Sequence, residues 1–285
     1  MNKIAQYFVL ILCFISLFSC NNESHKRTDK TTSKPNIIMF LVDDMGWQDT
    51  SVPFWDKITP LNKKYHTPNM ERLASEGMKF TQAYATPVCT PTRVSLISGM
   101  NAARHKVTSW TLKRDIDMVK PPKGLKLPKW NVNGAQPTDS ILHSVHITPL
   151  PQILKDNGYR TIHSGKAHFG ALDTPGANPT NLGFEINIAG HAAGAPGSYY
   201  GTKNFENTRR KEGIWNVPGL EKYHGQEIFL TEAITREAIS AMDVAINNET
   251  PFYLYMAHYA VHTPIQGDPR FEQKYLDQGL DSIEA

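Results

Sequence analysis

A short apolar run near the start of the chain constrains the fold more than any other feature. The stretch 36–42 reads Asn-Ile-Ile-Met-Phe-Leu-Val and shows no alternation between apolar and polar positions. A strand that is buried on both faces of a parallel sheet has this pattern. We therefore predict a central strand here.

Helix-then-strand units recur along the chain. The first has Thr67 as N-cap, proline at the first helical position and Gly77 at the end, which predicts a helix. Apolar stretches that follow each helix predict strands. The expected pairs are 67–77 with 78–84, 148–158 with 159–164, and about 226–247 with 251–259. The fold class expected is α/β, with a mostly parallel central sheet flanked by helices.

Composition and charge narrow the function classes. The chain has 285 residues, of which 40% are hydrophobic and 20% charged, as in soluble globular proteins. Its formal net charge of +3 comes without a dense stripe of lysine and arginine. We therefore expect no nucleic-acid partner.

The first 20 residues have the features of a bacterial lipoprotein signal peptide. Lys3 precedes an apolar run over 7–18 that is too short to span a membrane. The run ends in Leu-Phe-Ser-Cys20, which resembles a lipobox, in which the cysteine is lipidated. A plain secretory leader is the alternative. Polar residues 21–34 predict a disordered tether, so we expect 35–285 to be a folded domain held at the cell envelope by a lipid anchor.

Two long stretches interrupt the alternation of predicted helices and strands. Residues 106–147 are rich in proline, lysine and tryptophan, and residues 171–225 are rich in glycine, asparagine and aromatic residues. Long irregular segments inside a domain are usually functional loops. We interpret both as walls of a substrate pocket; ordinary surface insertions are the alternative.

Cys89 is the one cysteine of the expected domain, because Cys13 leaves with the leader and Cys20 carries lipid. It precedes a helix predicted over about 92–98, with Pro91 placed to fix the first turn. Unpaired N–H groups at a helix N-terminus attract anions and favour a reactive thiolate. Arg93 adds a planar donor fork suited to sulfate or phosphate. An inert buried cysteine is the alternative.

Further candidate residues follow the predicted strands, where ligands bind in open α/β sheets. Asp43 and Asp44 follow the first strand, and adjacent carboxylates with oxygen ligands favour Ca²⁺ or Mg²⁺; a helix cap or a turn is the alternative. Lys166 and His168 follow the strand 159–164 and alternate on an extended segment. Two histidines, His258 and His262, flank the end of the last strand. For these two histidines, and for Lys166 and His168, a purely structural role is the alternative.

Residues 89–99 carry the pattern C-x-P-x-R followed by x-x-L-x-[ST]-G. Three further motifs are the opening N-I-I-x-x-x-x-D-D, the block G-K-x-H-x-G at 165–170 and the turn H-T-P at 262–264. In these motifs and their order the chain resembles a known family, the type I or formylglycine-dependent sulfatases of the alkaline-phosphatase-like superfamily, which have a fold like that of alkaline phosphatase. The resemblance covers residue 35 to the end of the chain.

The resemblance implies a mechanism. A maturation enzyme would oxidise Cys89 to formylglycine, whose hydrated diol attacks sulfur, releases the alcohol and later expels sulfate. Asp43, Asp44 and the modified Cys89 would hold one Ca²⁺. The resemblance also assigns roles to the remaining candidates: Arg93 and Lys166 stabilise charge, His168 assists deprotonation of the diol, and His262 protonates the leaving alcohol.

Family members are usually longer, and the region after the H-T-P turn normally supplies further metal ligands and another lysine. We therefore expect the chain to be the N-terminal part of a sulfatase, with an incomplete Ca²⁺ site and little activity alone. Two other functions stay open: a phosphatase or phosphodiesterase of the same superfamily, and a surface lipoprotein that binds sulfated glycans without hydrolysis. Candidate contacts to a sulfated carbohydrate substrate are Trp110, Lys113, Arg114, Trp130, Tyr199, Tyr200 and His224.

Overall fold

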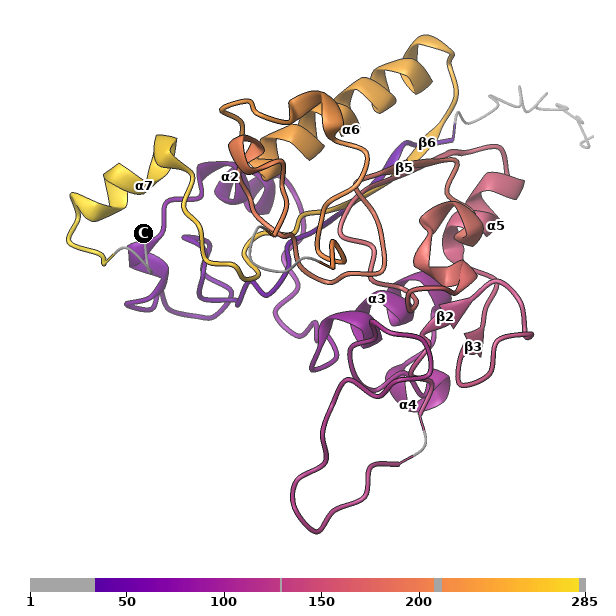
Figure 1. Ribbon diagram of the computed structural model, residues 1–285. Helices are drawn as coiled ribbons and strands as arrows, with labels where there is room; N and C mark the ends of the chain where they lie inside the picture. Colours follow the sequence, from indigo (N-terminus) through magenta and orange to yellow (C-terminus); the bar gives the residue numbers. More distant parts are fainter. Residues whose placement is uncertain (1–33, 129, 208–211, 282–285) are drawn as a thin grey trace, which may run out of the picture. The chain divides into compact units, whose positions relative to one another are not determined.

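Four short strands form one parallel sheet in the order β1–β6–β4–β5 (Figure 1). The computed structural model describes residues 34–128, 130–207 and 212–281. The predicted leader, Cys20 and residues 21–33 of the predicted tether lie outside the described residues. The parallel order confirms the predicted α/β class; the strands are β1 (Ile37–Leu41), β4 (Arg160–Gly165), β5 (Ile186–Ile188) and β6 (Phe252–Ala257).

Alternating side chains of β6 build two hydrophobic cores, one on each face of the sheet. Phe252, Leu254 and Met256 pack with α6 (Leu230–Asn247) in the first core. Tyr253 and Tyr255 face the second core, which contains residues of α3 (Cys89–Ser98) and α5 (Leu150–Asp156). All six residues of β6 are buried, as expected for a strand covered on both faces.

The remaining elements are short and lie between or beyond these layers. They are the helices α2 (Pro68–Glu76), α4 (Ala102–His105) and α7 (Pro269–Leu276), the small parallel strands β2 (Ala135–Gln136) and β3 (Val145–His146), and the 3₁₀ turns η1 (Asn62–Lys64), η2 (Pro175–Ala177), η3 (Pro179–Leu182), η4 (Gly201–Lys203) and η5 (Glu221–Tyr223). Within the described residues no helix is long and apolar enough to span a bilayer.

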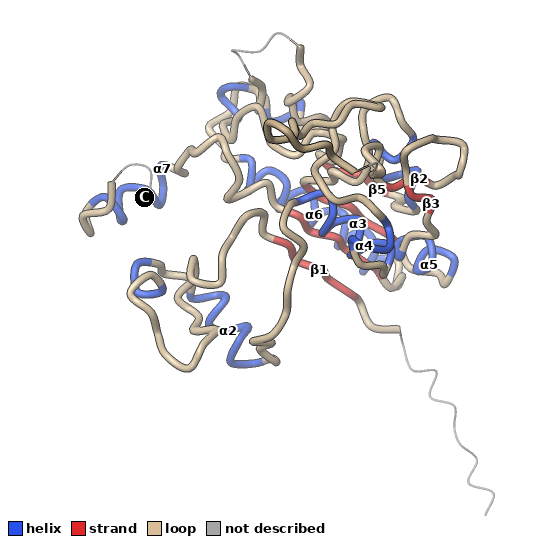
Figure 2. The backbone as a smooth tube through the Cα atoms, turned by 90° about the horizontal axis from the view of Figure 1, so that it is seen from below, coloured by secondary structure: helices blue, strands red, loops and turns tan. Residues whose placement is uncertain are grey.

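β1 departs from its prediction, although the strand itself exists. It lies at the edge of the sheet rather than at its centre, because only β6 pairs with it among the described residues. Ile38 and Phe40 keep 53% and 58% of their surface exposed, so one face of β1 is open. Figure 2 shows β1 along this border of the sheet. An apolar run identifies a strand, but the covering of its second face depends on distant segments.

The strand predicted over 78–84 is wrong. No strand occurs there, and Met78, Phe80 and Tyr84 are each more than two-thirds exposed. A strand needs a neighbour with which to exchange backbone hydrogen bonds. The helix before this segment is confirmed as α2, but its predicted N-cap contact is absent, because the Thr67 hydroxyl bonds to Thr50 and Ser51 instead.

Candidate active site

Residues that follow three adjacent strands converge at one edge of the sheet. Asp43 and Asp44 follow β1, Lys166 follows β4, and His262 follows β6 by a turn. The strands β1, β6 and β4 are direct neighbours, and parallel strands end at the same edge. The predicted strand-end residues therefore come together, as the sequence suggests.

Asp43 is the centre of a buried ion cluster. Arg93 donates from Nη2 to Asp43 Oδ1 at 2.9 Å, and Lys166 Nζ donates to Asp43 Oδ2. Arg93 also donates from Nη1 to the carbonyl oxygen of Lys166 at 2.7 Å. The three residues are at most 5% exposed, so the two cations and the carboxylate depend on one another.

Burial sets the proton affinity of Lys166. Desolvation lowers its pKa, repulsion by Arg93 lowers it further, and attraction by Asp43 opposes both. The ammonium is thus held in place mainly by Asp43. Without that carboxylate, two positive groups would face each other in a dry environment.

The N-terminus of α3 presents Cys89. The helix begins at Cys89 itself rather than at Thr92, so the thiol is on its first residue and Pro91 is inside the first turn. Arg93, one turn later, points into the protein towards Asp43, whereas Cys89 is half-buried and lines a cavity. One helical turn therefore supplies a cation beneath the cavity and a thiol in its wall.

The segment 165–168 is not extended as predicted. Gly165 has a φ of +100° and His168 a φ of +52°, so the chain curls after β4. A β-carbon on Gly165 would lie 1.9 Å from the carbonyl oxygen of Ala257, which only glycine avoids. This close approach lets the amide of Lys166 donate to that oxygen at 2.7 Å. The side chains of Lys166 and His168 still reach the same site.

His168 is buried with one ring nitrogen engaged. Its Nε2 donates to the carbonyl oxygen of Thr111 at 2.7 Å, whereas Nδ1 has no hydrogen-bond partner among the described residues. Burial, with the nearby charge of Lys166, holds the pKa of His168 well below its usual range. The ring is therefore neutral at pH 7 and its free nitrogen can accept a proton.

His262 lies at the mouth of the site. Its Nδ1 donates to the carbonyl oxygen of Thr263 at 2.8 Å, and its Nε2 lies 3.7 Å from Asp44 Oδ2. The Asp44 side chain is 57% exposed, in contrast to the buried Asp43. The Nε2 atom of His262 therefore faces Asp44 at the mouth of the site.

The acidic pair offers ligands for a divalent cation. Single ligand atoms of Asp43, Asp44 and His262 lie within 4.8 Å of one another. Carboxylate oxygens suit Ca²⁺, which takes six to eight oxygen ligands, so Asp43 and Asp44 fit the ion but supply only part of its coordination. Cys89 lines the same cavity but is not in this cluster.

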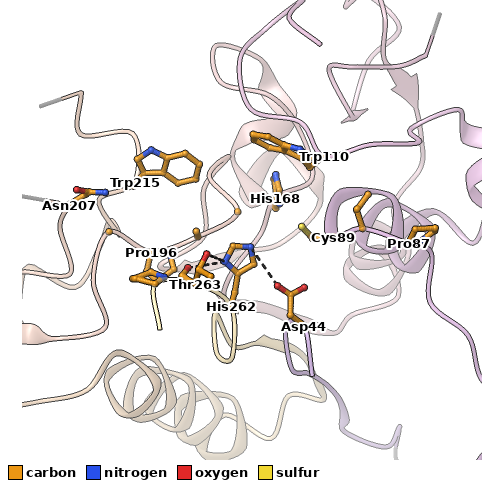
Figure 3. Close-up of a pocket in the computed structure, with 15 residues that line it drawn as sticks. Asp44, Pro87, Cys89, Trp110, His168, Pro196, Asn207, Trp215, His262 and Thr263 are labelled. Carbon is orange, nitrogen blue, oxygen red and sulfur yellow. Dashed lines mark hydrogen bonds and ion pairs between the residues drawn. The ribbon is translucent and has the colours of Figure 1, made fainter. Parts of the chain in front are cut away.

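These residues open into a cavity of about 580 Å³ (Figure 3). Asp44, Cys89, His168 and His262 line its floor and side. Both long irregular stretches supply walls, as predicted: 106–147 contributes one tryptophan and 171–225 contributes a glycine-rich turn, an asparagine and a second tryptophan. These wall residues include Trp110, Gly194, Gly197, Asn207 and Trp215.

Several predicted residues lie elsewhere. His258 packs its ring 5.1 Å from Phe40, and burial lowers its pKa to about 4, so its place is structural. Of the seven predicted sugar contacts, Trp110 lines the cavity. The other six lie outside its lining: Lys113, Arg114, Trp130, Tyr199, Tyr200 and His224.

Tyr199 has a different place from the one predicted. It is 3% exposed, and its hydroxyl donates to the carbonyl oxygen of His262 at 2.8 Å. Its amide donates to Oε1 of Gln266 at 2.7 Å, and the hydroxyl of Tyr200 donates to the carbonyl oxygen of Gly267 at 2.9 Å. These bonds hold the loop that carries His262. Sequence gave no signal for them, because most of them involve backbone atoms.

Comparisons with known proteins agree with this geometry. The family model described as Sulfatase matches residues 35–281. The N-acetylgalactosamine-6-sulfatase of Mus musculus is 28% identical over 94% of this chain and 46% of its own length. A sulfatase of Formosa agariphila is 28% identical over 94% of this chain and 52% of its own. The chain thus spans about half the length of the curated relatives it matches.

A solved structure shares the fold. The crystal structure of Ps i-CgsB superposes with a TM-score of 0.61 at 25% identity, over 88% of this chain and 51% of that one. The match of the family model covers nearly all of the described residues, including every element that builds the cavity. This chain therefore belongs to the sulfatase family.

Proposed function

We propose that the protein hydrolyses sulfate monoesters of a carbohydrate, with residue 89 as the nucleophile. The observation that carries the proposal is that Cys89, His168, His262 and Asp44 line one cavity, while Asp43, next to Asp44 in the chain, holds the buried cations of Arg93 and Lys166. Arg93 and Lys166 are both close enough to Cys89 to interact with its charge. Preorganised cations lower the barrier for a reaction in which negative charge develops.

The proposed nucleophile depends on a modification. Oxidised by a maturation enzyme to formylglycine and hydrated, residue 89 would supply a geminal diol in place of the thiol. His168 is proposed to take a proton from a hydroxyl there, because it lines the same cavity and its Nδ1 has no hydrogen-bond partner among the described residues. His262 is proposed to give a proton to the departing alcohol, because it lines the cavity and its Nε2 faces Asp44 there.

A calcium ion is the proposed metal, held by Asp43, Asp44 and the modified residue 89, and it would withdraw charge from the sulfate oxygens. The charges of the site favour joint binding of metal and substrate. Asp43 and Asp44 carry two negative charges, which Arg93 and Lys166 already balance. A divalent cation alone would leave the site positive, and an anionic sulfate ester reduces this excess. We expect Ca²⁺ to bind weakly alone and more tightly when sulfate is present.

Mass spectrometry and activity test the proposal together. The peptide that contains Cys89, isolated from the native host, should carry CHO in place of CH₂SH. Cys89→Ala should abolish hydrolysis of a sulfated oligosaccharide and leave the melting temperature unchanged. An unmodified thiol with tight glycan binding would instead support the non-catalytic alternative. Hydrolysis of phosphate esters in preference to sulfate esters would favour the phosphatase alternative.

A sulfated carbohydrate is the proposed substrate class. The related Ps i-CgsB was crystallised with k-i-k-neocarrahexaose, and other relatives are N-acetylgalactosamine-6-sulfatases. Trp110 and Trp215 in the cavity walls offer ring faces for a sugar. We also propose attachment to the bacterial envelope through lipidated Cys20. Cys20→Ala should move the protein from the membrane fraction to the soluble fraction, and an unchanged distribution would refute the anchor.

A further inference from the structure

A long loop starts directly at the active site and projects from the body below α4 (Figure 1). Its base is tied to the reaction centre, since the Thr111 carbonyl accepts from His168 and the Thr111 amide donates to Thr90 Oγ1 at 3.2 Å. The carbonyl of Leu112 accepts from the Leu172 amide at 2.7 Å. We call residues 113–128 the basic arm. Because its base is fixed, the arm extends from the side of the cavity that Trp110 lines.

Charges near the base of the arm are already paired. Lys113 lies 3.9 Å from Glu212, and Arg114 lies 3.5 Å from Asp115. Asp115 also accepts from Asn133 Nδ2 at 2.8 Å. Asp117, also exposed, accepts from the Val119 amide at 2.9 Å. Opposite charges thus neighbour each other at the base of the arm, so its binding surface is expected further out.

The outer part of the arm is different. Residues 118–128 contain Lys120, Lys123 and Lys126 and no acidic residue. All three lysines are exposed, and within the described part of the chain no hydrogen bond or ion pair engages them. The amide of Leu125 donates to the carbonyl of Pro122 at 3.0 Å, so residues 122–125 form a turn that contains Lys123, and Lys126 follows it directly.

This concentration of charge is unusual for the molecule. The whole chain has a formal net charge of +3, which equals the charge of these three lysines. Unpaired cations on a narrow projection create a local positive potential that attracts polyanions and releases their counterions. None of the three lysines lines the cavity, so a single sulfated sugar bound there would not gain from them.

We propose that the basic arm binds the part of a sulfated polysaccharide that continues beyond the cavity. This inference rests on the proposed function and narrows it: the substrate is a polymer with sulfates on several residues, not a single sulfated sugar. The reacting ester enters the cavity, and the following sulfates lie along Lys120, Lys123 and Lys126. The arm thereby raises affinity for the polymer and leaves the chemistry at residue 89 unchanged.

The test compares two triple variants with the same change in net charge. Lys120→Gln, Lys123→Gln and Lys126→Gln together neutralise the arm. The control variant, Lys57→Gln, Lys155→Gln and Lys274→Gln, neutralises exposed lysines elsewhere. Binding to carrageenan is measured by biolayer interferometry over a series of NaCl concentrations, with galactose 6-sulfate as the monomeric ligand.

The arm variant should lose about tenfold or more in carrageenan affinity at low salt. The slope of log K against log NaCl concentration should become less negative by about two, since each cation contributes about 0.7 to 0.9 to this slope in nucleic-acid systems. The control variant should keep the wild-type slope. Equal losses in both variants, or none in the arm variant, would overturn the proposal.

Two further outcomes separate this inference from its alternatives. If Cys89 proves unmodified while carrageenan binding still depends on the arm, the arm proposal stands and the proposed hydrolysis fails. If the arm variant hydrolyses polymer and monomer like the wild type, the arm proposal fails and the hydrolysis stands. Arm-dependent binding to phosphatidylglycerol vesicles that exceeds binding to carrageenan would assign the arm to a lipid surface and refute the glycan assignment.

Discussion

Removing the charge of Asp43 should destabilise the fold far more than removing that of its neighbour Asp44. In Asp43→Asn, Arg93 and Lys166 lose the one carboxylate that both contact, and the new amide turns an N–H₂ group towards one of them. Both cations are at most 1% exposed, so water cannot replace the lost partner. Breaking a buried pair in this way costs about 3–5 kcal/mol. For a domain of this size, that corresponds to a fall in melting temperature of about 10 °C.

Asp44→Asn is the matched control. The same substitution one residue away removes an exposed carboxylate that lies 3.7 Å from His262, a contact of about 0–1 kcal/mol. Urea unfolding followed by circular dichroism measures both variants. A loss for Asp43→Asn within about 1 kcal/mol of the control would refute the reasoning, since breaking a well-made buried pair costs several times that.

The Asp43 variant should also show a distinct pH dependence. Burial lowers the pKa of Lys166 in the folded protein, and Asp43 opposes this. Between the lowered folded pKa and the usual value near 10.5, the unfolded chain binds more protons, so stability rises with pH. Without Asp43 this window extends to lower pH. Asp43→Asn should therefore regain stability between pH 7 and 10 more steeply than the wild type, and a parallel profile would contradict the assignment.

Two further predictions concern other parts of the structure. Tyr199→Phe removes the hydroxyl that donates to the His262 carbonyl. The loop that carries His262 should then be less well held, so kcat should fall about tenfold with KM nearly unchanged, and amide hydrogen exchange near His262 should accelerate. An unchanged exchange rate would refute the positioning role of Tyr199. Burial lowers the pKa of His163 to about 3 and those of His191 and His258 to about 4, so the unfolded chain takes up protons first and stability should fall from pH 6.5 to 4. His163→Phe, which keeps an aromatic ring against Tyr255, should flatten the melting curve against pH, and an unaltered slope would contradict the assignment.

Much of the fold follows from local patterns in the sequence. Helix-then-strand units, two of them with a proline near the start of the helix, predicted α2, α5, α6, β4 and β6, and their alternation predicted a parallel sheet. The order β1–β6–β4–β5 could not be predicted, because it depends on the pairing of β6 with β1, which pairs Tyr253 with Ile37, and with β4, which pairs Phe252 with Arg160, and these partners lie far apart in the sequence. The same limit explains the wrong strand over 78–84 and the open face of β1, since apolar residues favour burial without specifying a partner.

The candidate site was predictable as a set of residues but not as a set of contacts. Asp43, Lys166 and His262 follow strands, and strand ends of a parallel sheet meet at one edge, so their convergence followed from the sequence. The hydrogen bonds that these and the neighbouring site residues make did not follow from the sequence. Arg93 bonds to the carbonyl of Lys166, His168 to that of Thr111, and backbone acceptors have no sequence signature because every residue carries one.

Gly165 shows how a residue without a side chain determines the chemistry of the site. Its positive φ and its contact with the Ala257 carbonyl bring the ends of β4 and β6 together. The Lys166 amide can then bond to that carbonyl, which fixes the backbone from which the ammonium reaches Asp43. Any β-carbon at 165 would separate the two strand ends and withdraw Lys166 from the ion cluster. Gly165 is therefore required because it fixes the position of Lys166. Through Lys166 it also maintains the ion pair that balances the charge of Asp43.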